Sequence, residues 1–381
     1  MKMIRKIYRG LKSLDQYAQL ILYYYSEDKQ IKKYLKNAPQ PELTQKEKRE
    51  IDSYWKQYGI RFKNYDWFRW YYGFTGIKSP KFIPKQIHVK TILPYYNERA
   101  SSTFSRAVSD KNLFYDILPD ANFPEPLLKN IDGAFFDKYD HYVCGSENLI
   151  DLLMYDQREV IVKKSIETGQ GKSVKKYSIM HRYDAQRLLD DWKDESNYIV
   201  QKAIKQHPFF ARFNESSVNI MRINSLCLNG KVEIHTPILR FGYPGWITDV
   251  SFIDGLEDVR VIGITDDGYL MDEVVSMLGK RWNLSDVVKD YENKKIPYWD
   301  EIVAFIKENA PKLKHIGRIG WDITVSENGK PVVIEYNITY PGSYLSQIAG
   351  GPLFGEWTDM ALEFLKDKKN QKKYIPHWLR V

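Results

Sequence analysis

The segment 319–337, IGWDITVSENGKPVVIEYN, constrains the fold more than any other part of the chain. Alternating apolar and polar residues flank the pair Asn328-Gly329, and this pattern is typical of a β-hairpin closed by a two-residue type I′ turn. Such a turn fixes the register of the two strands, and in this register Asp322 lies directly opposite Glu335. The sequence therefore predicts a hairpin that brings two carboxylates side by side.

The predicted register also sorts the other side chains of the hairpin, because side chains alternate between the two faces of a strand. The residues expected to face the core are Ile323, Val325, Val332 and Ile334. The residues expected to share the face of the two acids are Thr324, Val333 and Asn337. One apolar face would thus support two carboxylates and an amide on the other.

This arrangement of acids indicates a metal site. Facing carboxylates lie roughly 5 Å apart and repel each other. A divalent cation would remove the repulsion, and Mg²⁺ is usually held by one or two carboxylates together with substrate phosphates. The predicted ligands are therefore Asp322, Glu335 and Asn337. The alternative is an exposed face with solvated acids; the tight loop at Pro341-Gly342 and the apolar Trp321 favour the metal site.

A second motif in the sequence is suited to binding phosphate. The predicted strand Glu159–Lys163 ends in a lysine, and the loop Thr168-Gly-Gln-Gly-Lys-Ser173 follows it. An ammonium group can meet phosphate oxygens, and glycine lets backbone N–H groups approach them closely. The expected nucleotide contacts are Lys163, Gly169, Gln170, Gly171, Lys172 and Ser173. A plain hairpin turn is the alternative.

Two phosphate-binding families are excluded by order and spacing. A Walker A loop requires glycine at the position of Ile166, and a protein kinase places its glycine loop before the strand lysine. His181-Arg-Tyr-Asp184 does not match the kinase catalytic loop, and no Asp-Phe-Gly motif exists.

Further polar positions extend the candidate site. The segment Gln201-Lys202-Ala203-Ile204 ends a predicted strand and can offer backbone groups to an adenine edge. Asn219 and Arg222 are polar within a long apolar strand, and Arg222 suits charge that develops on a transferring phosphoryl group. A salt bridge at the sheet edge is the alternative for Arg222, and Arg240 has the same ambiguity.

The composition leaves several partner classes open. The formal charge of +8 and the pI of about 9.0 suit ATP, an acidic sugar, an anionic membrane surface or nucleic acid. Cys144 and Cys227 stand alone, which predicts buried free thiols in a reducing cytoplasm. The N-terminal 25 residues predict an amphipathic helix, either packed on the protein or resting on anionic lipid.

The organisation along the chain predicts an α+β protein. Residues 1–95 are expected to form a helical extension. In it the aromatic stretch YDWFRWYYGFTG is expected to provide packing, with single-stranded nucleic-acid binding as the alternative. Strands dominate after Arg158, helical patterns return at 271–293 and 298–313, and a C-terminal helix ends in a basic tail. The expected parts are 1–95, 96–155, a lid subdomain at 156–200 that carries the glycine-rich loop, and 201–381 with the metal site.

Taken in order, these motifs resemble the ATP-grasp superfamily, and most closely its sugar-transfer-associated branch. The resemblance rests on the Lys163 strand, Gly169-Gln-Gly171, the segment 201–204, Ser217-Val-Asn219-Ile-Met-Arg222, and the pair Gly320-Trp-Asp322 with Glu335-Tyr-Asn337. It extends from about Asp110 to Gly342, and the glycine loop and hinge are its loose parts.

The resemblance implies an ATP-grasp fold in which two α+β subdomains clasp ATP, with two Mg²⁺ ions on Asp322, Glu335 and Asn337. It implies Lys111 and Lys163 as nucleotide-binding lysines and Arg222, Lys163, Arg240 and Asn219 as catalytic residues. The implied reaction joins a carboxylate to an amine through an acylphosphate. An amino acid and a sugar carboxylate are the expected substrates, in capsule or surface-polysaccharide biosynthesis.

One departure concerns the acceptor pocket. The branch commonly continues its Arg-x-Gly strand into Asp-Asn and Gly-Gly, whereas Arg240-Phe-Gly242 is followed here by Asp249-Val250-Ser251 without a double glycine. For the first 100 residues we place no counterpart in the family.

Other activities and settings stay open. A kinase of a sugar or small molecule on the same fold and a non-catalytic basic adaptor on membrane or nucleic acid are the alternative functions. A cytoplasmic enzyme is expected, with possible peripheral contact to the inner membrane or a polysaccharide assembly complex and no nucleic-acid partner.

Overall fold

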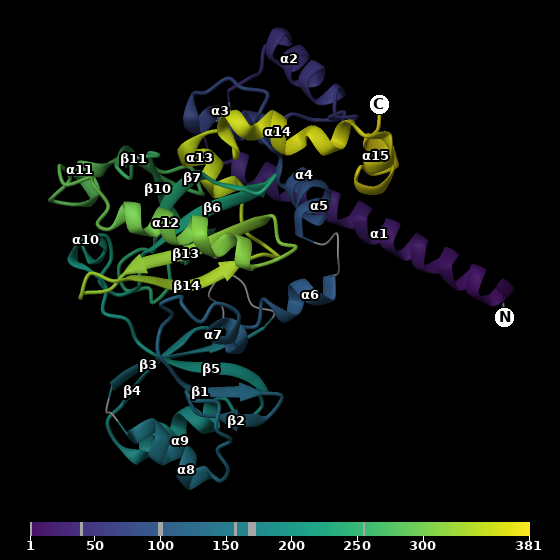
Figure 1. The fold of residues 1–381 in the computed structure, drawn as a ribbon. Coiled ribbons are helices and arrows are strands. Elements are labelled where there is room, and N and C mark those ends of the chain that lie inside the picture. Colours follow the sequence, from purple (N-terminus) through teal and green to yellow (C-terminus); the bar gives the residue numbers. More distant parts are fainter. Residues whose placement is uncertain (1, 39–40, 98–101, 156–157, 167–172, 254–255) are drawn as a thin grey trace. The chain divides into compact units, whose positions relative to one another are not determined.

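The chain forms two compact units in a computed structural model that describes residues 2–38, 41–97, 102–155, 158–166, 173–253 and 256–381 (Figure 1). Unit 1 comprises Met1–Tyr95, Met277–Lys280 and Ser343–Val381. Unit 2 comprises Tyr96–Ser276 and Arg281–Gly342. The C-terminal 39 residues therefore belong with the N-terminal extension, and every metal ligand expected from the sequence lies in unit 2.

Unit 1 is helical, as the sequence predicts. Its elements before unit 2 are α1 (Lys2–Leu35), α2 (Gln45–Lys56), α3 (Asp66–Thr75), α4 (Lys85–Ile87), the π-helix η1 (His88–Ile92) and α5 (Leu93–Asn97), which runs across the boundary into unit 2. Its C-terminal elements are α13 (Tyr344–Gly350), η4 (Gly355–Trp357), α14 (Thr358–Leu362), η5 (Glu363–Lys366), α15 (Lys368–Tyr374) and η6 (His377–Leu379).

Aromatic packing holds unit 1 together, which confirms the interpretation of the YDWFRWYYGFTG stretch. In α3 the side chains of Trp67, Trp70 and Tyr71 are at most 2% exposed. Tyr71 stacks on Phe82 with ring centroids 4.9 Å apart, and Trp70 stacks on Tyr34 of α1 at 5.6 Å. Buried aromatic pairs gain about 0.5–1.5 kcal/mol beyond the burial of their area, so this stretch is a core and not a nucleic-acid surface.

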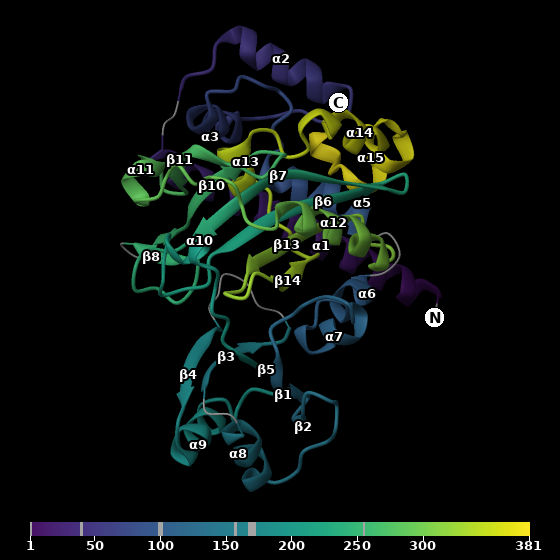
Figure 2. The same ribbon diagram turned by 60° about the vertical axis from the view of Figure 1, so that its left-hand side comes forward.

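A five-stranded antiparallel sheet of order β2-β1-β5-β3-β4 forms the first half of unit 2. Its elements are α6 (Ser102–Ala107), η2 (Lys111–Leu113), α7 (Phe114–Ile117), β1 (Pro126–Ile131), β2 (Ala134–Phe136), α8 (Ser146–Met154), β3 (Arg158–Lys164), β4 (Lys175–Ile179), α9 (Arg182–Asp191) and β5 (Asn197–Lys202). Helices α8 and α9 lie together on one side of this sheet (Figure 2). Val160 and Val162 of β3 face these helices in one buried cluster, so Lys163, which alternates with them, points to the opposite face.

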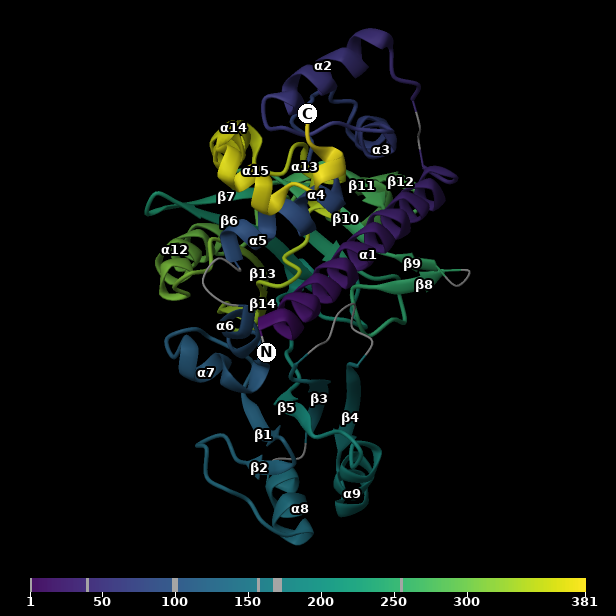
Figure 3. The ribbon, with the colours of Figure 1, turned by 90° about the vertical axis from the view of Figure 1, so that its right-hand side faces the viewer.

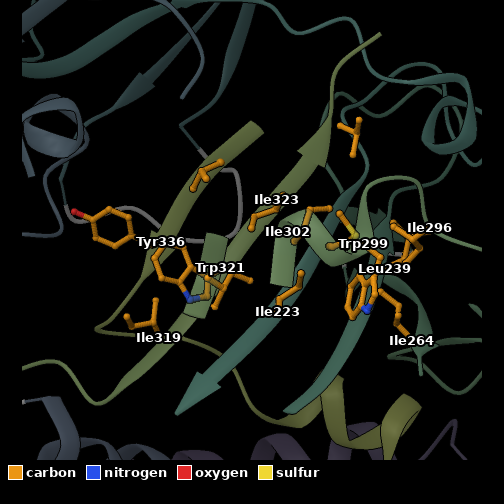
Figure 4. Packing of buried hydrophobic residues seen from close by; sticks show 14 of the residues in the cluster. Ile223, Leu239, Ile264, Ile296, Trp299, Ile302, Ile319, Trp321, Ile323 and Tyr336 are labelled. Carbon is orange, nitrogen blue, oxygen red and sulfur yellow. The ribbon is translucent and has the colours of Figure 1, made fainter. Parts of the chain in front are cut away.

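A seven-stranded sheet of order β12-β11-β10-β7-β6-β13-β14 forms the second half of unit 2. Its elements are α10 (Pro208–Ala211), β6 (Ile220–Leu228), β7 (Lys231–Phe241), the pair β8 (Ser251–Ile253) and β9 (Leu256–Asp258), β10 (Arg260–Ile264), β11 (Leu270–Ser276), β12 (Arg281–Asn283), α11 (Leu284–Val287), α12 (Trp299–Asn309), η3 (Ala310–Lys312), β13 (Arg318–Val325) and β14 (Pro331–Asn337). Trp321 and Ile323 of β13 pack against Ile302 of α12 in its core (Figure 4).

The helix expected at 298–313 is confirmed by α12 and η3, whereas the helical pattern assigned to 271–293 is wrong. That segment forms β11 and β12, and only Leu284–Val287 is helical. Val274 pairs with Ile262 of β10 on one side and with Trp282 of β12 on the other. Pairing with two neighbouring strands outweighs the weak helical spacing of this short stretch.

Candidate active site

The hairpin turn is one residue longer than the sequence predicts. Ser326 N donates to Lys330 O over 2.9 Å, and Gly329 N donates to Ser326 O over 2.9 Å, so the loop is Glu327-Asn328-Gly329. Glycine at position 329 has φ +75°, whereas Asn328 does not adopt the positive φ that a type I′ turn requires. The turn is therefore a three-residue loop, and the predicted type I′ turn is wrong.

The acids nevertheless face each other, because a second irregularity cancels the first. Near the turn Ile323 pairs with Val333, one residue away from the predicted register, and a β-bulge follows between Asp322 and Ile323. Beyond the bulge Asp322 pairs with Glu335, as predicted. Bulges insert one extra residue in one strand and re-aim side chains, which is what restores the pairing here.

The bulge also corrects the predicted assignment of faces. Val333 and Tyr336 belong to the core cluster with Trp321 and Ile323, so Val333 does not share the face of the acids. Thr324 lies two residues after Asp322 and therefore on the same face of β13. Val332 pairs with Thr324, so Val332 lies on the acid side of the sheet instead of the core side.

Arg222 neutralises Asp322 directly. Its Nε and Nη2 donate to the two carboxylate oxygens of Asp322 over 2.5 and 2.8 Å, and Asn337 Nδ2 donates to the same carboxylate over 3.1 Å. Arg222 is 9% exposed and Asp322 is 3% exposed. Burial would lower the pKa of Arg222, but the contact with Asp322 raises it above its ordinary value. The closeness of the two acids therefore does not require a divalent metal ion, as the sequence suggested, because Arg222 already neutralises one of them.

Two lysines from the small-sheet half of unit 2 approach the second acid. Lys111 Nζ lies 3.4 Å from Glu335 Oε2, and Lys163 Nζ donates to Ile334 O over 3.4 Å. Burial alone would raise the pKa of Glu335, but Lys111, Lys163 and Arg222 outweigh it and lower the pKa to about 2. Burial, assisted by Lys111, lowers the pKa of Lys163 to about 8. The hairpin thus carries an ionised carboxylate between cations from two sheets.

The chemistry of this donor set fits Mg²⁺. Asp322, Glu335 and Asn337 present carboxylate and amide oxygens on one side of the hairpin, and Asn337 directs its N–H groups to Gly320 O and Asp322, which leaves its amide oxygen as an acceptor. Within the part of the chain that the structure describes, no three His, Cys, Asp or Glu residues gather as a metal cluster. A bound cation at this hairpin would therefore draw its remaining ligands from substrate phosphates or water.

Gly320 and the loop after β14 close one side of the carboxylates. A Cβ on Gly320 would lie 2.3 Å from Pro341 O, so only glycine fits there. Arg222 Nη1 donates to Pro341 O over 3.0 Å, and Gly342, with φ +79°, follows. The sequence expectation of a tight loop beside the acids is confirmed at Pro341-Gly342.

The expected adenine segment has part of its backbone already engaged. The N–H of Lys202 donates to Glu125 O over 2.9 Å, and the N–H of Ala203 donates to Glu159 O over 3.0 Å. The side chain of Gln201 donates to Tyr115 Oη over 2.6 Å. An adenine contact from this segment would accordingly use carbonyl groups or Ile204, not the N–H groups of Lys202 and Ala203.

The side chain of Asn219 forms hydrogen bonds with the backbone that precedes β6. Its Nδ2 donates to Phe210 O and Asn214 O, both over 2.8 Å, and its side chain is fully buried. These bonds fix α10 and the turn that leads into β6. Asn219 therefore positions the strand that carries Arg222, and the catalytic role expected for it from the sequence stays a prediction.

Arg240 pairs with a residue that the sequence analysis did not place in the site. Its Nη2 lies 2.6 Å from Asp249 Oδ2, and both side chains are less than 15% exposed. This is the salt bridge that was left open as the alternative for Arg240. It anchors the segment that departs from the family pattern, at the Asp249 position.

Arg318 is a second residue that the sequence analysis missed. It is fully buried and donates to Asn224 Oδ1 over 2.8 Å and to Gly342 O over 3.0 Å. Burial, reinforced by Arg222, lowers the pKa of Arg318 to about 9. The sequence could have indicated Arg318 through its spacing, because it precedes Gly320 by two residues and Asp322 by four, which places all three on one face of β13.

Four of the predicted phosphate contacts, Gly169, Gln170, Gly171 and Lys172, lie outside the described residues. Ser173 is half-buried in the turn before β4. The nucleotide-binding role of the glycine-rich loop therefore stays a prediction.

Comparisons with known proteins identify relatives by sequence and by fold. A family model described as sugar-transfer associated ATP-grasp matches residues 91–358. No curated protein gives a significant match. Among solved structures, the ATP-grasp ligase PsnB complexed with a minimal precursor aligns over 70% of this chain and 63% of its own, at 13% identity and a TM-score of 0.41.

Two further solved structures carry ligase titles. D-alanyl-alanine synthetase A from Vibrio cholerae O1 biovar eltor str. N16961 aligns over 70% of this chain and 67% of its own, at 13% identity and a TM-score of 0.41. The D-alanine-D-alanine ligase from Coxiella burnetii aligns over 72% and 60%, at 12% identity and a TM-score of 0.39.

Proposed function

Because this chain belongs to the sugar-transfer associated ATP-grasp family, we propose that it is an ATP-dependent ligase that joins a carboxylate to an amine through an acylphosphate. The observation that carries the proposal is the hairpin of β13 and β14. It holds Asp322, Glu335 and Asn337 within reach of Lys111 and Lys163, which come from the other half of unit 2. Carboxylates beside lysines are the groups that hold a cation and the phosphates of a nucleotide.

The reaction balances in two steps. A carboxylate oxygen of the substrate attacks the γ-phosphorus of ATP, the bond between that phosphorus and the β,γ-bridging oxygen breaks, and ADP leaves. The nitrogen of the amine then attacks the acyl carbon, inorganic phosphate leaves with its bonding pair, and the nitrogen loses one proton. The protein positions the reactants and neutralises charge, because phosphoryl transfer asks for little covalent chemistry from the enzyme.

The residues divide this work between them. Lys163 and Lys111 neutralise phosphate oxygens, and a lysine whose pKa is about 8 is still largely protonated at neutral pH. Mg²⁺ held by Glu335, Asn337 and Asp322 would neutralise the β- and γ-phosphates. Arg222 holds Asp322 in place, and its positive charge also favours the charge that develops on the transferring group. Arg240, through its bond with Asp249, shapes the acceptor side.

We further propose a sugar carboxylate and an amino acid as the substrates, in the assembly of a capsule or surface polysaccharide. The family's association with sugar transfer supports this choice. Cys144 is exposed and Cys227 is half-buried, so the expectation of buried thiols is wrong, but neither cysteine forms a disulfide. An ATP-consuming reaction with two free thiols suits the cytoplasm.

A coupled assay tests the proposal. Purified protein with Mg²⁺-ATP should release ADP and inorganic phosphate in equal amounts only when a carboxylate and an amine are both present. A screen of amino acids against uronic acids, read by phosphate release and by mass spectrometry of the amide, identifies the pair. Lys163→Met supplies the inactive control, since Lys163 lies in the proposed phosphate site.

Two results would overturn the proposal. ADP formation with a hydroxyl substrate and no free phosphate would make the protein a kinase on the same fold. Failure of Mg²⁺-ATP to shift the melting temperature of the wild-type protein would make it a non-catalytic adaptor.

A further inference from the structure

The basic excess of the chain lies entirely in unit 1. By its sequence, unit 1 carries 27 Lys and Arg against 12 Asp and Glu, a formal charge of +15. Unit 2 carries 30 against 37, a formal charge of −7. The proposed ATP site lies in unit 2, so a nucleotide does not account for the charge of unit 1. A charge of this size on a unit outside the active site indicates a separate anionic partner.

Helix α1 is one long continuous helix (Figure 3), and part of its apolar surface is exposed. Large apolar residues of its middle part are strongly exposed: Leu14 65%, Ile21 45%, Leu22 65% and Tyr25 69%. Their spacing of three, four and seven residues places them along one stripe of a helix. In the sequence, the same spacing continues toward the N-terminus through Ile4, Ile7 and Leu11. The exposed apolar residues from Leu14 to Tyr25 mark an interaction surface.

Positive charge accompanies this stripe. The sequence carries basic residues at positions 2, 5, 6, 9 and 12, and the first acid of the chain is Asp15. A helix that combines an apolar stripe with Lys and Arg is typical of segments that lie in the interface of an anionic membrane. Each Lys or Arg near such a surface contributes about 1 kcal/mol, or roughly a fivefold gain in partitioning.

The C-terminal elements of unit 1 add the same chemistry beside α1. Tyr17 of α1 lies edge-on to Trp378 with ring centroids 5.1 Å apart, and Tyr24 meets the same indole at 5.9 Å. The neighbouring helix α15 carries four exposed lysines, Lys368, Lys369, Lys372 and Lys373. Trp and Tyr are enriched where protein meets the headgroups of a bilayer, and lysines there meet lipid phosphates.

We propose that unit 1 binds the surface of an anionic membrane through the exposed stripe of α1, with the lysines of α15 beside it. Nucleic acid would use the positive charge but would leave the apolar stripe without a role. A second copy of α1 would cover the stripe but would leave the basic residues without an anionic partner. Only an anionic lipid surface satisfies both features. None of the helices in the described part of the chain combines the length and hydropathy needed to cross a bilayer.

Vesicle co-sedimentation of the full chain tests the inference. The protein should bind vesicles of phosphatidylcholine with 30 mol% phosphatidylglycerol, bind pure phosphatidylcholine at least tenfold more weakly, and lose binding as salt rises. The double variant Leu14→Glu/Leu22→Glu should lower partitioning at least tenfold. Lys368→Glu/Lys369→Glu should lower it at least about twentyfold, from roughly fivefold or more for each reversed charge.

Matched controls separate this surface from general effects. Ile77→Glu removes another exposed apolar side chain of unit 1, at 44% exposure, and Lys231→Glu/Lys314→Glu reverses two exposed lysines of unit 2. Both should leave partitioning within about twofold of wild type. Circular dichroism and the melting temperature establish that each variant is folded.

Several outcomes would overturn the inference. One is that the wild type does not bind anionic vesicles, and another is that the Leu14→Glu/Leu22→Glu variant binds them as well as the wild type does. A third is that light scattering shows a dimer, which this variant dissociates, while no protein binds vesicles. Binding to duplex DNA, without vesicle binding and insensitive to Leu14→Glu/Leu22→Glu, would replace the membrane with nucleic acid. The inference does not depend on the proposed ligase activity, and phosphate release is measured separately.

Discussion

The buried pair of Arg222 and Asp322 predicts a strong energetic coupling. The arginine donates two hydrogen bonds of 2.5 and 2.8 Å to one carboxylate, and the two residues are 9% and 3% exposed. Removing one partner of such a pair leaves a buried charge without compensation, which costs about 3–5 kcal/mol. Arg222→Met and Asp322→Asn should each lower the free energy of unfolding by about that amount.

The double variant should be less damaged than the sum of the two. Replacing both partners removes both buried charges, so Arg222→Met/Asp322→Asn should recover at least about 2 kcal/mol relative to additivity. Urea unfolding followed by tryptophan fluorescence measures the free energy of unfolding of the four proteins in this double-mutant cycle. Arg212, the residue directly after α10, supplies the control: Arg212→Met should not couple to Asp322→Asn. Additive losses within about 0.5 kcal/mol would refute the reasoning, because independent sites behave in that way.

Three further predictions concern single residues. Lys163→Met should lower kcat at least about 100-fold with unchanged far-UV circular dichroism, since it removes a preorganised cation, and a loss below threefold would contradict its role. Burial, with Arg318 nearby, lowers the pKa of His235 from 6.5 to about 4. As the pH falls from 6.5 to 4, the unfolded chain therefore binds a proton at this histidine and the folded chain does not, so the free energy of unfolding should fall by up to about 1.4 kcal/mol per pH unit. The urea midpoint of His235→Gln should change less between pH 7.5 and pH 5 than that of the wild type, and an equal change in both proteins would contradict this role of His235. Gly320→Ala should displace the Pro341 loop, and a variant with the melting temperature and activity of wild type would exclude the close approach.

The sequence predicted the pairing of Asp322 and Glu335 through two errors that cancel. The Asn-Gly pair indicated a two-residue turn, whereas the structure has a three-residue loop and a compensating bulge. Local turn chemistry is readable from a dipeptide, but a bulge depends on how both neighbours of a strand pair with it. Here β13 is held by β6 on its other side, with Asp322 opposite Arg222.

Those same long-range pairings explain what else sequence alone could not supply. Arg222 and Asp322 are 100 residues apart, and only the sheet order places them on adjacent strands, so the sequence could not identify the acid that Arg222 neutralises. The segment 270–283 has a pattern too short to distinguish helix from strand. By contrast, the aromatic core of α3 and the strand that presents Lys163 followed from periodicity and composition alone.

The central claim, that the hairpin of β13 and β14 holds Mg²⁺ for a nucleotide, is tested most directly by the Mg²⁺ dependence of ADP binding. Titration calorimetry across a Mg²⁺ series should show that Glu335→Gln raises the half-saturating Mg²⁺ concentration at least tenfold, while Glu327→Gln, in the loop of the same hairpin, leaves it unchanged. Equal Mg²⁺ dependence in wild type and Glu335→Gln would contradict the account.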